Sequence, residues 1–169
     1  LNDVYPYLNS QALIAGQWQV KRGSRSASEH EVFLTENIYP TLERLKQSAL
    51  SDGLLKPRVI YGFYPTHSNG NQVLVYDPEL YEKSGELKLW QTFDFPRGRA
   101  KKLCLADFIA PAELDGKKSG VVDVMALQIV TVGQEASEHA QKLFKGDNYS
   151  EYLYFHGFSV EMAEALAEY

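Results

Sequence analysis

Few side chains in this sequence are placed to do chemistry, and they form no self-contained catalytic set. Cys104 is the only cysteine, and no spacing puts a histidine beside it as a base. Its apolar neighbours in L-C-L-A predict a small core residue. The four histidines lack the spacing of metal ligands, and glycine-rich phosphate or dinucleotide motifs are absent. We therefore predict no catalytic residue and no metal site.

Two aspartates stand at the edges of apolar segments. Asp107 follows L-C-L-A and precedes F-I-A-P, and Asp123 lies inside the apolar run Val121–Val132. A carboxylate at the end of a buried segment must be paired or hydrogen-bonded. Each is therefore interpreted as a structural cap or a surface residue, with a ligand contact as the alternative.

Glu164 lies between alanines in the terminal stretch of the chain. At 3.6 residues per turn it falls opposite a stripe of Met162 and Leu166, on the side of Glu161 and Glu168. Periodicity alone predicts three solvated glutamates. A ligand lying along that side is the alternative.

The net charge of −5 is unevenly distributed. Residues 134–169 hold seven acidic and two basic residues, whereas residues 1–133 hold fifteen of each. Solvated helix faces explain this bias, and a surface for a cationic ligand or basic partner is the alternative. Nucleic-acid binding is disfavoured, because it needs an excess of Lys and Arg. The basic stretch 96–102 has no interleaved aromatic residues and is interpreted as a solvated loop.

No apolar run approaches the roughly 20 residues that span a bilayer, so no membrane segment is expected. The start lacks the basic and apolar regions of a secretory signal. One unpaired cysteine favours a reducing compartment, and we expect a soluble, cytoplasmic protein.

Helical sequence patterns occur before and after a run of predicted strands. A long helix is expected from Ser28 to Ser51, capped by Ser28 with Glu31 and either kinked or broken at Pro40. Further helices are predicted over 134–145, 147–156 and 158–169, with Gly157 and a Ser159 cap separating the last two. Period-two patterns predict strands over 58–64, 72–76 and 87–93, with a turn at P-T-H-S-N-G-N and a central strand over 121–132.

This order predicts an α+β fold with a mostly antiparallel, twisted sheet. Residues 1–169 are expected to form a single domain. The last helix lacks the signals that usually end a helix, so we expect the domain to be truncated at its C-terminus.

Several segments together resemble the activation domain of cobalamin-dependent methionine synthase. They are D-V-Y-P-Y-L-N (3–9), A-L-I-A-G-Q-W (12–18), K-P-R-V-I-Y-G-F-Y-P (56–65), F-D-F-P-R (93–97), L-C-L-A-D-F-I-A-P (103–111), A-L-Q-I-V-T-V-G (126–133) and H-G-F-S-V-E-M-A-E-A-L-A-E-Y (156–169). Their shared order and spacing carry the resemblance.

The resemblance implies a domain that binds S-adenosylmethionine and supports reductive methylation of cob(II)alamin. It implies two partners, the cobalamin-binding domain of the parent enzyme and a flavodoxin-type reductant. Asp3 and Glu164 match the family's ligand-contacting carboxylates. Carboxylates suit this ligand, because it carries sulfonium and ammonium charges.

The family's arginine-bearing R-P-A-x-G-Y segment does not occur within these 169 residues. We therefore expect the 169 residues alone to bind S-adenosylmethionine weakly or not at all. Two alternatives are a non-catalytic interaction module on the same scaffold and an unrelated small-molecule-binding domain.

Overall fold

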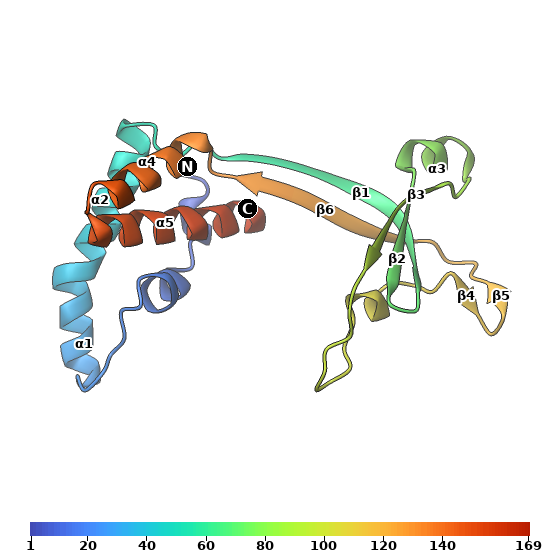
Figure 1. Ribbon diagram of the computed structural model, residues 1–169, viewed down its shortest axis with the longest axis horizontal. Helices are drawn as coiled ribbons and strands as arrows, with labels where there is room; N and C mark the ends of the chain where they lie inside the picture. The colour runs from blue at the N-terminus through green and yellow to red at the C-terminus, as the bar shows by residue number, and fades with distance from the viewer. The chain divides into compact units, whose positions relative to one another are not determined.

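The computed structural model describes residues 1–169, and their contacts divide into two compact units. Unit 1 contains Leu1–Ile60 and Ile129–Tyr169, and unit 2 contains Tyr61–Gln128. Helices precede and follow the main strands, and the strand pairs are antiparallel, which confirms the predicted α+β class (Figure 1). None of the helices combines the length and apolar character that a membrane crossing requires.

Unit 1 begins with short helical segments. They are η1 (Tyr5–Tyr7), η2 (Ala12–Gln17), α1 (Ala27–Phe33), η3 (Leu34–Ile38) and α2 (Tyr39–Ser51). The π-helical turn η3 lies between α1 and α2, directly before the Pro40 that opens α2. Proline fits the first turn of a helix but not its interior. The helical backbone continues through Pro40, and the predicted irregularity is the π-helical turn directly before it rather than a break.

The predicted capping box of Ser28 and Glu31 is wrong. Ser26 caps α1 instead, because its extended backbone (φ −63°, ψ 168°) aims Oγ at the first turn. Its Oγ accepts a 3.2 Å hydrogen bond from the Glu29 N–H, and the Glu29 carboxylate accepts a 2.8 Å bond from the Ser26 N–H. The box has the predicted chemistry but begins two residues earlier.

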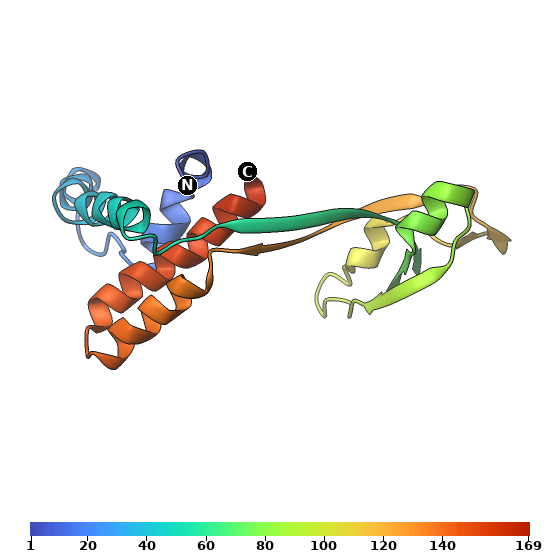
Figure 2. The same ribbon diagram turned by 90° about the horizontal axis from the view of Figure 1, so that it is seen from above.

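A helical hairpin completes unit 1. It consists of α4 (Gln134–Lys145) and α5 (Tyr149–Glu168), which lie side by side in Figure 2. The predicted helix over 134–145 is confirmed, but the predicted break at Gly157 is wrong because α5 runs straight through it. Ser159 is no cap either, since its buried Oγ donates a 2.8 Å hydrogen bond to the Phe155 carbonyl. Asn148, rather than Asp147, precedes the first turn of α5.

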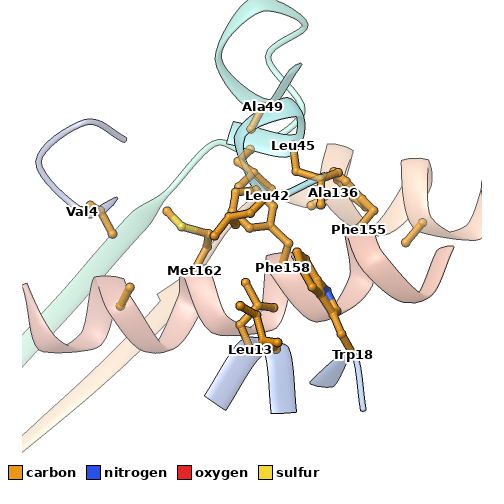
Figure 3. Packing of buried hydrophobic residues seen from close by; sticks show 14 of the residues in the cluster. Val4, Leu13, Trp18, Leu42, Leu45, Ala49, Ala136, Phe155, Phe158 and Met162 are labelled. Carbon is orange, nitrogen blue, oxygen red and sulfur yellow. The ribbon is translucent and has the colours of Figure 1, made fainter. Parts of the chain in front are cut away.

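The main hydrophobic core surrounds α5. Leu13 and Trp18 pack on one side of this helix, and Leu42 of α2 lies on the opposite side (Figure 3). Phe158 and Met162 fill the space between them and are fully buried. Burying such side chains contributes about 1.5–3 kcal/mol each, so α5 is the element on which unit 1 is assembled.

The sheet has the strand order β3-β2-β1-β6. Its strands are β1 (Arg58–Asn69), β2 (Gln72–Tyr76), β3 (Leu89–Asp94) and β6 (Asp123–Thr131). Unit 2 also contains α3 (Pro78–Ser84), η4 (Leu105–Phe108) and a small hairpin of β4 (Glu113–Leu114) and β5 (Lys117–Lys118).

Two strand predictions need correction. The predicted turn P-T-H-S-N-G-N is mostly strand: β1 continues to Asn69, and only Gly70 and Asn71 form the turn. Gly70 has φ +60°, which glycine adopts without strain. The apolar run expected to be central forms β6, which lies at the sheet edge. Hydrophobicity indicated a strand there but did not specify its neighbours.

Candidate functional site

Glu164 lies on α5 with its side chain exposed. It makes no hydrogen bond or ion pair with the protein. The alanines around it favour the helix, and Met162 and Leu166, which are buried, hold the opposite side of α5 in the core. The prediction of an outward-facing Glu164 is confirmed, and its carboxylate is open to a cation.

A cavity of about 270 Å³ lies within unit 1 close to this position. It is lined by the end of β6, by Ala136 and Ala140 of α4, and by Val160 and Ala163 of α5. Glu164 directly follows Ala163 and stands one turn after Val160, so it falls about 40° from Val160 around the helix. The carboxylate therefore stands near the border of a small cavity whose lining also includes Thr131, Ser137, His156 and Ser159.

Asp3 lies in the turn at the start of unit 1, where the N–H groups of Val4 and Tyr5 both donate to the Leu1 carbonyl. Val4 is buried in the core and fixes this turn, whereas the Asp3 side chain is exposed and unpaired. The following η1 packs on α5, with the Tyr7 ring 5.7 Å from the Tyr169 ring. Asp3 and Glu164 thus lie on two segments of unit 1 that pack together.

The N-terminal segment meets α5 most closely at Gly157. A Cβ on this glycine would lie 2.8 Å from the Gln17 Cβ and 3.0 Å from Trp18 Cδ1. The Trp18 indole N–H donates a 2.9 Å hydrogen bond to the Tyr154 carbonyl. Gly157 is therefore a point of close packing between η2 and α5, not a helix stop.

The structure contradicts the prediction that Glu161 is solvated. Glu161 is only 7% exposed, and its carboxylate accepts a 3.3 Å hydrogen bond from the Gln17 side-chain amide. Periodicity put it on the outer side of α5, but η2 covers that side next to Gly157. The glycine in H-G-F-S was the available sequence signal, because such a residue permits another segment to approach closely.

Asp107 has a structural role. Arg97 donates two hydrogen bonds to its carboxylate, at 2.7 and 2.5 Å, and the Cys104 N–H donates a third at 3.3 Å. The Arg97 hydrogen bond is the main reason that the pKa of Asp107 lies below its ordinary value. The capping interpretation is confirmed, and one arginine of the basic stretch is engaged within unit 2.

Asp123 is likewise structural. Its carboxylate accepts hydrogen bonds from the N–H groups of Ala110, at 3.0 Å, and Val124, at 2.8 Å. These two backbone bonds lower the pKa of Asp123. The side chain therefore fastens the start of β6 to the loop before β4.

Cys104 and His67 are also held inside unit 2. The Cys104 thiol is buried and donates a 3.1 Å hydrogen bond to the Phe95 carbonyl, as expected for a core residue. His67 contacts the Tyr76 hydroxyl through Nδ1, at 3.2 Å, and the Val121 carbonyl through Nε2, at 2.8 Å. No cluster of three or more potential metal ligands occurs among residues 1–169.

Known proteins similar to this chain are methionine synthases. The chain is 38% identical over 166 residues to the methionine synthase of Mycobacterium tuberculosis, which covers 96% of this chain and 13% of that protein. It is 35% identical over 171 residues to the Mycobacterium leprae methionine synthase, covering 99% and 14%. The chain therefore spans about one seventh of the length of these relatives.

A solved structure described as the MetH reactivation domain bound to AdoHcy has the same fold. The TM-score is 0.66 at 20% identity, covering 99% of this chain and 50% of that one. A family match extends over residues 1–169, and it does not favour an interaction module without a reactivation role. The sequence, fold and family match lead to one conclusion: the chain belongs to the family described as vitamin B12 dependent methionine synthase, activation domain.

Proposed function

We propose that this chain supplies part of an S-adenosylmethionine site that supports reductive methylation of cob(II)alamin within a B12-dependent methionine synthase, and that the 169 residues alone bind this ligand weakly or not at all. The observation that carries the proposal is the pair Asp3 and Glu164. Both are exposed carboxylates without a protein partner, on segments of unit 1 that pack together. Residues 1–169 correspond to half of the related solved chain.

The ligand's charges suit these carboxylates. S-adenosylmethionine carries a sulfonium and an ammonium group, and two opposite charges about 4 Å apart attract by about 1–4 kcal/mol between bulk water and a protein surface. When the methyl group leaves, the electron pair of the broken C–S bond stays on sulfur, which becomes neutral. Carboxylates near the sulfur therefore favour the methyl donor over the demethylated product.

The related solved domain supports this assignment, because it is bound to AdoHcy, the demethylated form of the same ligand. In the proposed reaction, cobalamin held by another domain of the parent enzyme supplies the reduced cobalt that accepts the methyl group. The electron would come from a flavodoxin-type partner. Residues of this chain hold and orient the donor, and the reaction would take place in the cytoplasm.

Calorimetry on the parent enzyme tests the proposal. Glu164→Gln should weaken S-adenosylmethionine binding about tenfold, which corresponds to about 1.4 kcal/mol, and should weaken S-adenosylhomocysteine binding less. Glu168→Gln is the matched control, since Glu168 is an exposed glutamate one turn further along α5. Equal losses for both ligands, or no loss for Glu164→Gln, would refute the proposed role of Glu164.

A further inference from the structure

Two hydrogen bonds on either side of Gly157 fasten η2 to α5. Trp18 donates to the Tyr154 carbonyl at 2.9 Å, and Gln17 donates to the Glu161 carboxylate at 3.3 Å. These acceptors are seven residues apart, about two turns or about 10 Å along the helix. Gln17 and Trp18 thus bind α5 at two separate points. Together these contacts fix both the position of η2 and its direction across the helix.

Of the two hydrogen bonds, the one to the Glu161 carboxylate is the more costly to break. Glu161 is nearly buried, and no Lys or Arg pairs with it among the ion pairs of the chain. A buried carboxylate is costly unless it is hydrogen-bonded, and the Gln17 amide is its hydrogen-bond donor. Gln17 therefore cannot turn away without leaving a buried charge unpaired.

The segment held in this way also carries Asp3. From η2 the chain runs back through η1, which packs on α5 and brings Tyr7 against Tyr169. A change in the direction of η2 about Gly157 would shift this segment along α5. Val4, directly after Asp3, lies in the same hydrophobic cluster as Leu13 of η2, so the turn that holds Asp3 is packed with η2 in one core.

Building on the proposed function, we propose that Gln17 and Glu161 are positioning residues that set the spacing of Asp3 and Glu164 to fit the methyl donor. Gln17 of η2 and Glu161 of α5 bind each other rather than the ligand. Their effect on affinity is exerted through the orientation of the N-terminal segment.

An exchange of the two side chains tests this inference in the parent enzyme. Gln17→Glu places two carboxylates face to face, and like charges at this distance repel. We expect it to weaken S-adenosylmethionine binding at least tenfold and to speed deuterium exchange of the Trp18 amide, which donates to the Leu13 carbonyl. The double variant Gln17→Glu with Glu161→Gln rebuilds the amide–carboxylate pair, and both quantities should return to within threefold of the starting protein.

Gln141→Glu is the matched control, since it adds the same charge at an exposed position of α4. Binding by Gln17→Glu at the original strength, or failure of the double variant to restore binding, would overturn the inference. If Gln17→Glu does not fold, the double variant must restore folding. A double variant that also fails to fold would overturn the inference. If the unaltered protein binds no S-adenosylmethionine, the proposed function fails, whereas the amide-exchange comparison still decides whether the pair fixes η2.

Discussion

Gly157 and Gln17 approach so closely that a methyl group on the glycine would lie 2.8 Å from the Gln17 Cβ. This distance is below any ordinary carbon–carbon contact. The glycine thus permits the contact between η2 and α5 on which unit 1 depends. It lies inside the long helix α5, where glycine is otherwise unfavourable.

Gly157→Ala should destabilise the protein. Alanine gains about 1 kcal/mol of helix propensity, but forcing a methyl group into this contact costs about 1–3 kcal/mol, and Trp18 on the other side limits relaxation. Urea unfolding should show a net loss of about 1 kcal/mol in the free energy of unfolding.

Gly16→Ala is the control, because no atom lies within 4 Å of its added Cβ, and it should be neutral or stabilising. Unchanged stability of Gly157→Ala would mean that η2 can move away freely.

Local signals in the sequence predicted most of the helices but not what packs on them. The helix irregularity next to Pro40 and the helix over 134–145 follow from backbone chemistry and are confirmed. Gly157 was ambiguous, since glycine serves both as a helix stop and as a site of close packing. The partner η2 lies about 140 residues earlier in the chain, and periodicity within one helix carries no information about it. The misplacement of Glu161 has the same origin.

His67 should contribute to the stability of unit 2 through its hydrogen bonds to Tyr76 and Val121, of which the first is buried. His67→Leu removes a partner of the buried Tyr76 hydroxyl, whereas the Val121 carbonyl keeps a 3.2 Å hydrogen bond from the Ser119 hydroxyl. A buried polar group without a partner costs about 1–3 kcal/mol. Chemical denaturation should show a loss in that range. His156→Leu is the control at an exposed histidine. Similar behaviour of the two variants would show that the His67 contacts are dispensable.

The sequence predicted which segments form strands better than it predicted where those strands end. The stretch P-T-H-S-N-G-N has strong turn composition, yet Thr66 and His67 are buried strand residues. The Thr66 hydroxyl donates to the Leu74 carbonyl across the hairpin and His67 bonds to Tyr76. Tertiary hydrogen bonds therefore override local turn preference, and only Gly70 and Asn71 remain in the turn.

The ion pair of Asp107 and Arg97 should make stability depend on pH. The folded state lowers the pKa of Asp107 below its ordinary value near 3.8, so the pair stabilises fully above that value and is lost as the pH falls through the lowered pKa. Asp107→Asn should therefore unfold at a lower urea concentration than the unaltered protein at pH 7, and the difference should narrow as the pH falls below 3.8. Glu113→Gln, at an exposed glutamate without an ion pair, should show no such difference. A difference in stability that does not narrow below pH 3.8 would point to a role of Asp107 beyond its charge.

The candidate site was predictable only through the family resemblance. Nothing in the spacing around Asp3 singles it out, and periodicity placed Glu164 among ordinary surface glutamates. The structure shows both carboxylates unpaired, with Val4 and Met162 anchoring their segments in one core. Their role as ligand contacts stays a prediction.

Transfer of a radiolabelled methyl group tests the proposed reactivation role most directly. The parent enzyme, with its cobalamin as cob(II)alamin and a flavodoxin-type reductant present, is given methyl-labelled S-adenosylmethionine, and label on the cobalamin is measured over time. We predict that the unaltered protein and Glu168→Gln acquire label at the same rate, and that Glu164→Gln at subsaturating donor is about tenfold slower. Label transfer that is unaffected by deleting residues 1–169 would contradict the assignment of the methyl donor to this chain.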